Sequence, residues 1–339
     1  MQQVLKKLML LENLTTDEAG SAMEAMMTGE ATHAQMGAFL TALRIKGETV
    51  EEISAFATIL RNKANRVTLS FDAVDIVGTG GDGANTFNIS TAAAFVTAAA
   101  GMPVAKHGNR AASSLCGTAD VLEALGCNIT LTPKQAVSCL ERTGICFLFA
   151  QAFHSSMKHV AQPRRELGVR TVFNLIGPLA NPAFVRHQLL GVASRDLVAP
   201  MALVLANLGM THAMVVHGED GLDELSIGGY SWVAEVVNGK VAEFRITPED
   251  FGLQRHELES IQGGNPLKNS KILRSVLRGE IGACRDVVLL NAGAALCVAD
   301  KASSIGEGVA LAIRAIDSGA ALTRLEAYIV ESNRILPEP

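Results

Sequence analysis

Short apolar segments alternate with stretches long enough for helices through the middle of the chain. The apolar segments cover residues 74–77, 102–105, 145–149, 189–193 and 214–216. Strands that are separated by helix-length connections are typical of a parallel sheet with helical crossovers. The pattern therefore predicts an α/β fold with a mostly parallel central sheet flanked by helices.

The first 65 residues show helical periodicity and no strand signal. Two capping-box patterns, Thr15-x-x-Glu18 and Thr49-x-x-Glu52, indicate helix starts. Gly29 and Gly47 stand where helices should stop. We therefore expect a small, all-helical N-terminal domain before the sheet.

Residues 231–247 break the alternation of strands and helices. Two strand-like runs, 232–237 and 241–246, flank the dipeptide Asn238-Gly239, which is a strong signal for a hairpin. The remainder of the chain predicts helices over residues 267–277, 286–298, 303–317 and 320–332, with little strand.

Composition narrows the class of protein. Of 339 residues, 48% are hydrophobic and only 4% aromatic, which favours small aliphatic side chains packed between helices and a sheet. A net charge of −5 without long basic runs argues against nucleic acid as a partner. The six cysteines include no Cys-x-x-Cys pair, so we expect reduced thiols and a cytoplasmic location. The N-terminal residues lack a secretion signal, and the apolar stretch 91–100 is too short to span a bilayer.

Residues 75–91 predict a strand, an anion-binding loop and the start of a helix. Glycines at positions 78, 80, 81 and 83 permit positive φ angles and a close approach of the backbone to a ligand. Asn88, Ser90 and Thr91 stand where the next helix needs its N-cap. Free N–H groups and the helix dipole then favour phosphate. The loop is not a P-loop and matches the dinucleotide fingerprint only through its density of glycines, so a glycine-rich turn without a ligand is the alternative.

A second anion-binding loop is predicted at Lys106-His-Gly-Asn-Arg110, after the strand at 102–105. In open parallel sheets, ligands bind at the carboxyl edge of the strands, where both loops should emerge. Lys106 and Arg110 would supply cations for a phosphate or pyrophosphate, and Ser113 and Ser114 extend the same surface. A solvated loop is the alternative for this motif alone.

Four carboxylates lie within six residues in Glu219-Asp-Gly-Leu-Asp-Glu224. Their repulsion has to be relieved by a cation or by solvent. Such a loop, without a lysine or arginine inside it, suits Mg²⁺ held by carboxylates, waters and phosphate oxygens of a substrate. Asp223 and Glu224 are the better ligand candidates, because Glu219 and Asp220 occupy a glycine-flanked turn that should face water. An acidic loop in solvent is the alternative.

Cations are dense in residues 154–168, which are expected to be helical. Arg164 and Arg165 form a solvated face in the simplest interpretation. One arginine turned into a cleft would instead bind a carboxylate in bidentate fashion. No role is assigned to the lone histidines or to the cysteines.

Taken together, these motifs resemble those of the anthranilate phosphoribosyltransferase family. The matching stretches cover nearly the whole chain and comprise Gly29-Glu-Ala-x-x-Ala-Gln-x-Gly-Ala-Phe-Leu-x-Ala-Leu-Arg44, Asp75-x-x-Gly-Thr-Gly-Gly-Asp82, Asn88-x-Ser-Thr91, Lys106-His-Gly-Asn-Arg110, Ser113-Ser114, Ala119-Asp-Val-Leu-Glu-Ala-Leu-Gly126, Asn174-x-x-Gly-Pro-Leu-x-Asn-Pro182, Gly221-x-Asp-Glu224 and Asn291-Ala-Gly-Ala-Ala-Leu296. The related pyrimidine nucleoside phosphorylases are the alternative, but their Lys-His-Ser-Thr-Gly-Gly is missing here. Intact Lys106, Asp223 and Glu224 argue against a catalytically silent paralogue.

The resemblance implies a reaction and its residues. The phosphoribosyl group of 5-phosphoribosyl 1-pyrophosphate would pass to the amine of anthranilate with Mg²⁺ present, releasing pyrophosphate in L-tryptophan biosynthesis. The implied catalytic residues are Lys106, Asp223 and Glu224; the implied Mg²⁺ ligands are Ser90, Asp223 and Glu224; and the implied anthranilate contacts are Gly78, His107, Asn109 and Arg164. The implied contacts of the sugar pyrophosphate are Gly78, Gly81, Asp82, Thr86, Asn88, Ile89, Ser90, Thr91, Lys106, His107, Gly108, Asn109, Arg110, Ala111, Ala112, Ser113, Ser114 and Thr118.

The resemblance also implies a domain plan. Residues 1–66, completed by a helical segment at about 155–180, would form a helical domain hinged to an α/β domain of residues 67–154 and 181–339. The protein would be a cytoplasmic homodimer through the helical domain. Its partners would be small-molecule substrates, with no nucleic acid and no membrane.

Overall fold

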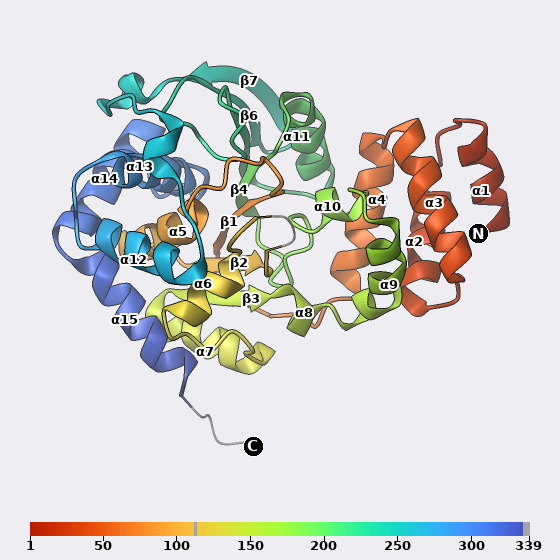
Figure 1. Ribbon diagram of the computed structural model, residues 1–339, viewed down its shortest axis with the longest axis horizontal. Coiled ribbons are helices and arrows are strands. Elements are labelled where there is room, and N and C mark those ends of the chain that lie inside the picture. Colours follow the sequence, from red (N-terminus) through yellow and green to blue (C-terminus); the bar gives the residue numbers. More distant parts are fainter. Residues whose placement is uncertain (112–113, 335–339) are drawn as a thin grey trace.

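The computed structural model describes residues 1–111 and 114–334. Helices gather at one end of the molecule, and a sheet covered by further helices forms the other end (Figure 1). The chain opens with α1 (Gln2–Met9), α2 (Thr16–Thr28), α3 (His33–Lys46) and α4 (Val50–Asn62). Both predicted capping boxes form, at Thr15 and at Thr49, and Gly29 and Gly47 end their helices. The predicted helical start of the chain is confirmed.

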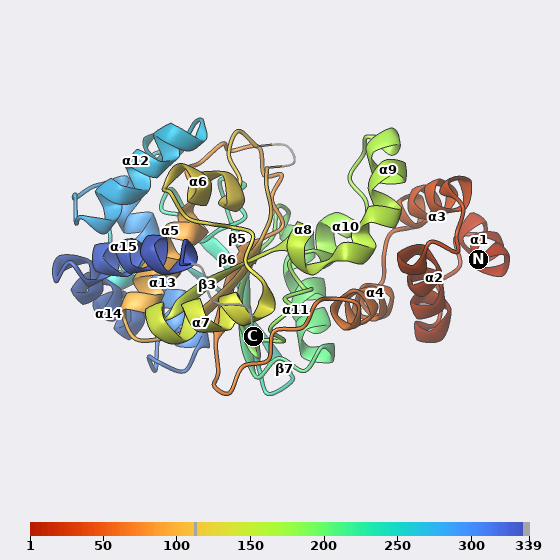
Figure 2. The same ribbon diagram turned by 90° about the horizontal axis from the view of Figure 1, so that it is seen from below.

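A later segment of the chain returns to these helices. It consists of α8 (Ala150–Phe153), α9 (Lys158–Leu167) and α10 (Phe173–Ile176). Helix α9 packs against α2 and α3, and α10 packs against α4 (Figure 2). Val160 and Phe173 of this segment share a buried core with Met23 and Phe56. We call α1 to α4 together with α9 and α10 the helical unit.

Seven strands form one sheet in the order β3-β2-β1-β4-β5-β6-β7. They are β1 (Val74–Gly78), β2 (Val104–Gly108), β3 (Ile145–Phe149), β4 (His187–Gly191), β5 (His212–Gly218), β6 (Ser231–Val237) and β7 (Lys240–Ile246). The first five are parallel, and β5, β6 and β7 pair antiparallel. Asn238 and Gly239 both have positive φ in the turn between β6 and β7, so the predicted hairpin is confirmed.

Alternate residues along the strands face two different cores, as the pleat of a strand requires. Leu189 and Met214 face a core shared with the helices of the sheet's own domain, whereas Leu190 and Val215 face the core shared with the helical unit. The remaining helices are α5 (Ile89–Ala99), α6 (Thr118–Ala124), α7 (Pro133–Thr143), α11 (Val198–Asn207), α12 (Pro266–Leu277), α13 (Ala283–Val298), α14 (Ile305–Asp317) and α15 (Ala320–Ser332). Both faces of the parallel part of the sheet are therefore covered, whereas most residues of the edge strand β7 are exposed or half-buried.

The structure corrects two details of the sequence analysis. Strand β2 continues through Lys106 and His107 to Gly108, because all three pair with β3, so these residues belong to the strand and not to a loop after it. Gly78 is also not a positive-φ residue: among the four glycines of the first loop, only Gly80, Gly81 and Gly83 have positive φ. Gly78 ends β1, and a Cβ there would lie 2.4 Å from Asp223 Oδ2, so close approach explains the glycine.

A cleft at the carboxyl edge of the sheet

The two predicted loops and the acidic turn after β5 meet in one cleft of about 330 Å³. The amide of Gly80 donates to Asp223 Oδ2 at 2.6 Å, which ties the acidic turn to the glycine loop. The start of α5 also faces this cleft. Its N-cap Asn88 makes no side-chain capping bond, because its Oδ1 accepts instead from Asn269 Nδ2 at 3.0 Å, while its Nδ2 donates to the carbonyl of Cys116 at 3.1 Å. At the start of α5 the amide of Ile89 donates to the carbonyl of Phe87 at 2.8 Å, and the amide of Ser90 donates to the carboxylate of Glu224, so the acidic turn also contacts this helix end.

Most of the residues singled out in the sequence line this cleft. They are Gly78, Gly81, Asp82, Thr86, Asn88, Ile89, Ser90, Lys106, His107, Gly108, Asn109, Arg110, Ala111, Ser114, Thr118, Asp223 and Glu224. Thr91 does not line it, because its buried hydroxyl faces that of Thr118 at 3.4 Å. Ala112 and Ser113 lie outside the described residues.

Lys106 is a buried cation in the floor of the cleft, with 2% of its surface exposed. Its ammonium donates to the carbonyl of Ile76 and, at 3.2 Å, to Ser90 Oγ. Burial lowers the pKa of Lys106, while the charges of Asp75, Glu224 and Asp223 oppose that shift. A buried cation beside carboxylates is well placed to meet an anionic substrate.

Asp223 and Glu224 are half-buried carboxylates that are short of positive charge. Burial raises the pKa of Glu224 to about 7, although Lys106 acts in the opposite direction. Burial and the charge of Glu224 together raise the pKa of Asp223 well above its ordinary value. Crowded carboxylates with raised pKa values indicate a place for a cation. Of the other two acids in this turn, Glu219 is exposed as expected, but Asp220 is half-buried and accepts a hydrogen bond from Ser226, so it stabilises the turn.

A buried polar pair supports the floor of the cleft from below. Asp75 is fully buried; its Oδ1 accepts from the amide of His107 at 3.1 Å and its Oδ2 accepts from Asn181 Nδ2 at 2.8 Å. Asn181 also donates to the carbonyl of Ala105 at 2.8 Å. Asp75 therefore holds β2 in register next to Lys106. Both Asp75 and Asn181 stand within sequence motifs named above, but no role was predicted for either residue.

Burial raises the pKa of Asp75 from 3.8 to about 6, which predicts a pH-dependent contribution to stability. An acid that is harder to ionise in the folded state adds stability below its unfolded pKa and loses it as the pH rises through its folded pKa. In urea unfolding, the stability advantage of wild type over Asp75→Asn should shrink by about 2 kcal/mol between about pH 4.5 and 7.5. An advantage that stays constant or grows would contradict this result.

His107 and His154 form a neutral pair beside the cleft. Their ring centroids are 5.2 Å apart, and both side chains are buried. Burial lowers the pKa of His107 well below its ordinary value and that of His154 to about 4. Nε2 of both rings has no hydrogen-bond partner among the described residues. His107 lines the cleft, although its unpartnered Nε2 is itself buried.

Two arginines of the returning segment lie at or near the cleft. The Arg164 guanidinium lies 4.9 Å from the centroid of the Phe173 ring; Phe173 lines the cleft, but Arg164 does not. Arg170, which the sequence analysis did not mention, lines the cleft and donates to the carbonyl of Gly80 at 3.0 Å. No sequence signal distinguished Arg170 from the other cations of this segment.

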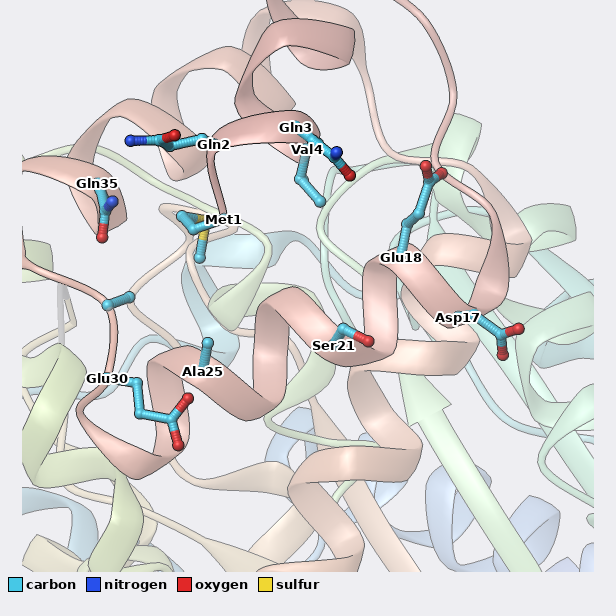
Figure 3. A pocket seen from close by; sticks show the side chains of 11 residues that line it. Met1, Gln2, Gln3, Val4, Asp17, Glu18, Ser21, Ala25, Glu30 and Gln35 are labelled. Carbon is cyan, nitrogen blue, oxygen red and sulfur yellow. The ribbon is translucent and has the colours of Figure 1, made fainter.

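A second, larger hollow of about 660 Å³ lies in the helical unit between α1 and α2 (Figure 3). The charged residues among its described lining are Asp17, Glu18 and Glu30, with no lysine or arginine. Glu18 is paired with Lys7 at 2.7 Å, and Met1, which carries the amino terminus, also belongs to the lining, so the acids of this hollow are partly matched by positive charge. Within the described residues, three or more His, Cys, Asp or Glu side chains nowhere gather closely enough to bind a metal by themselves. None of the described helices combines the length and the apolar character needed to cross a bilayer.

Comparisons with known proteins agree along the whole chain. Residues 2–64 match the glycosyl transferase family helical bundle domain, and residues 70–322 match the glycosyl transferase family a/b domain. The anthranilate phosphoribosyltransferase of Parvibaculum lavamentivorans is 55% identical over 94% of each chain. That of Symbiobacterium thermophilum is 53% identical over 100% of this chain and 99% of its own.

Solved structures show the same similarity. The crystal structure of anthranilate phosphoribosyltransferase from Thermus thermophilus superposes with a TM-score of 0.93 at 46% identity, covering 98% of this chain and 99% of that one. The enzyme from Saccharomyces cerevisiae in complex with PRPP and Mg superposes with a TM-score of 0.90 at 31% identity, covering 98% and 97% of the two chains.

Proposed function

This chain belongs to the anthranilate phosphoribosyltransferase family, and from that premise we propose that its cleft binds 5-phosphoribosyl 1-pyrophosphate, Mg²⁺ and anthranilate. The enzyme transfers the phosphoribosyl group to the amine of anthranilate, giving N-(5-phosphoribosyl)anthranilate and pyrophosphate in the biosynthesis of L-tryptophan. The observation that carries the proposal is the 2.6 Å hydrogen bond from the amide of Gly80 to Asp223. It joins an anion-binding loop and a cation-binding turn into one site, as a substrate with a metal-bound pyrophosphate requires.

The residues of the cleft fit a magnesium ion. Ser90, Asp223 and Glu224 would hold it, because hard oxygen donors suit Mg²⁺ and a bound cation would relieve the repulsion between the two adjacent carboxylates. Two carboxylates leave further positions for waters and for phosphate oxygens of the substrate. When bound, the ion supplies positive charge to the departing pyrophosphate.

Side chains and amides of the protein would stabilise a transition state in which the bond from the ribose to pyrophosphate is largely broken. The amine of anthranilate is a weak nucleophile, because its lone pair is delocalised into the ring, so departure of pyrophosphate should run ahead of attack. The Lys106 ammonium and the open amides of the glycine loop face the place where negative charge would build up. Asn109 and His107 would help to hold anthranilate on the opposite face of the ribose. This mechanism requires no strong general base.

Arg164 is proposed to act on anthranilate, with Phe173 as its neighbour. The proposal is supported by the position of its guanidinium over the ring of Phe173, a residue that lines the cleft. Arg164→Ala should mainly raise the KM for anthranilate, because it removes a contact remote from the bond that forms. Steady-state kinetics with each substrate varied in turn would measure the effect. An unchanged KM for anthranilate would refute this role.

One assay tests the function itself. The protein is mixed with 5-phosphoribosyl 1-pyrophosphate, Mg²⁺ and anthranilate, and the loss of anthranilate fluorescence is followed. The expected result is a loss that needs all three additions. No loss, together with phosphorolysis of thymidine by inorganic phosphate, would favour a pyrimidine nucleoside phosphorylase instead.

The domain plan and the assembly are proposals as well. A helical domain of residues 1–66 with 155–180, hinged to residues 67–154 and 181–339, is supported by the packing of α9 on α2 and α3. A homodimer through the helical domain is supported by exposed apolar side chains there, because exposed apolar patches mark contact surfaces. Leu10 is 70% exposed and Ile45 is 72% exposed. Sedimentation equilibrium would decide between monomer and dimer. A cytoplasmic location is supported by the six cysteines, all of which are free.

A further inference from the structure

Three cationic side chains line the cleft, and two of them are already matched by carboxylates. The carboxylates of Asp75, Glu224 and Asp223 interact electrostatically with the Lys106 ammonium. Arg110 forms ion pairs with Asp120, at 2.9 Å, and with Glu123. In the described part of the chain, no carboxylate lies within ion-pair distance of the third cation, Arg170, although its side chain lines the same cleft.

Arg170 rests directly on the glycine loop. Its Nη2 donates to the carbonyl of Gly80 at 3.0 Å, and a Cβ on Gly81 would lie 1.5 Å from its Nη1. The amide of the same Gly80 donates to Asp223 on the other side. A guanidinium carries five N–H donors, and this contact uses one of them. The rest of its planar fork remains for a second acceptor in the cleft.

Arg170 reaches the glycine loop from the helical unit. It lies between α9 and α10, and nearby Val172 and Phe173 are buried in the core that the helical unit shares with one face of the sheet. The glycine loop belongs to the sheet, at the end of β1. The contact between Arg170 and Gly80 therefore crosses from one side of the cleft to the other.

We propose that Arg170 binds the pyrophosphate group of the sugar substrate, an inference that rests on the function proposed above. The position favours pyrophosphate over the carboxylate of anthranilate, because the guanidinium lies beside Gly80, Gly81 and the turn of Asp223. A free guanidinium matches the paired oxygens of a phosphate in bidentate fashion. Binding would thus link the helical unit to the glycine loop through the substrate.

The test uses Arg170→Gln, because glutamine retains a donor for the Gly80 carbonyl but has no charge. The KM for 5-phosphoribosyl 1-pyrophosphate and the Kd of inorganic pyrophosphate with Mg²⁺, measured by calorimetry, should both rise about 10- to 100-fold. The KM for anthranilate should stay near that of wild type. Arg170→Lys should recover part of the affinity, since lysine restores the charge but not the fork. Arg165→Gln, at an exposed neighbouring position, is the control and should bind pyrophosphate as wild type does.

Two results would overturn the inference while the enzyme remains active. The first is unchanged pyrophosphate affinity in Arg170→Gln, which would leave Arg170 as a structural contact of the loop. The second is an effect confined to the KM for anthranilate, which would assign Arg170 to the aromatic acid. A wild-type protein without turnover would instead refute the proposed function, and this inference with it.

Discussion

Replacing Asp223 with asparagine should lower kcat about 10²–10³-fold, the usual cost of losing one electrostatic contact in the transition state. Asparagine is nearly isosteric, and its carbonyl oxygen can still accept the hydrogen bond from the amide of Gly80. The fold should therefore survive, while the site loses one of its two adjacent negative charges. Lys106→Ala should be similarly severe, because it removes the buried cation from the floor of the cleft.

The matched control for Asp223→Asn is Glu219→Gln. Glu219 belongs to the same acidic turn but is exposed, so loss of its charge should leave kcat near wild type. Anthranilate fluorescence follows turnover, and titration with Mg²⁺ at saturating sugar pyrophosphate reports whether the metal requirement has changed. Equal kcat values for wild type and Asp223→Asn would remove this carboxylate from the catalytic set.

Gly191→Ala should nearly abolish activity by moving the same turn without touching its charge. Gly191 ends β4 and pairs with Gly78, and a Cβ on it would lie 1.6 Å from the backbone oxygen of Asp223. The turn has to shift, which should break the bond between Gly80 and Asp223 and cost about 1–3 kcal/mol of stability. The loss of kcat should match that of Asp223→Asn, because both variants disable the same carboxylate.

Gly37→Ala is the control for the glycine substitution. Gly37 lies within α3, and nothing stands within 4 Å of the Cβ that alanine would add. A helical glycine is less favourable than alanine by up to about 1 kcal/mol, so this variant should be slightly more stable and fully active. Urea unfolding and the fluorescence assay measure both properties for the two variants. An active Gly191→Ala protein would show that the turn tolerates displacement.

Local chemistry explains which parts of the fold could be predicted. The capping boxes at Thr15 and Thr49 and the Asn238-Gly239 turn are decided within a few residues, and all three form as expected. The end of β2 was misjudged, because Lys106 and His107 look like loop residues by polarity. The strand continues through them because both pair with β3, and distant partners bind the Lys106 ammonium, at the carbonyl of Ile76, and the His107 amide, at Asp75.

The same distinction applies to the site. The glycine loop and the acidic turn stand out in the sequence because glycines and carboxylates are concentrated there. Gly191 does not stand out in the sequence. It has to be a glycine because Asp223 leaves no room for a Cβ, and Asp223 approaches it only in the folded chain. Arg170 could not be predicted for the same reason. It reaches the carbonyl of Gly80 because of the path that the returning segment takes in the fold, which the composition of the segment does not reveal.

Because of that returning segment, no single cut in the chain can separate the helical unit intact from the sheet. The chain passes from α4 to β1, comes back after β3 through α8, and passes again from α10 to β4. A fragment that ends at residue 66 would lack α9 and α10. The apolar side chains of α2 to α4 that these two helices cover would then be exposed to solvent. Circular permutation, or recombination between relatives, would have to preserve all three connections between the helical unit and the sheet. The two parts are therefore expected to be inherited and engineered together.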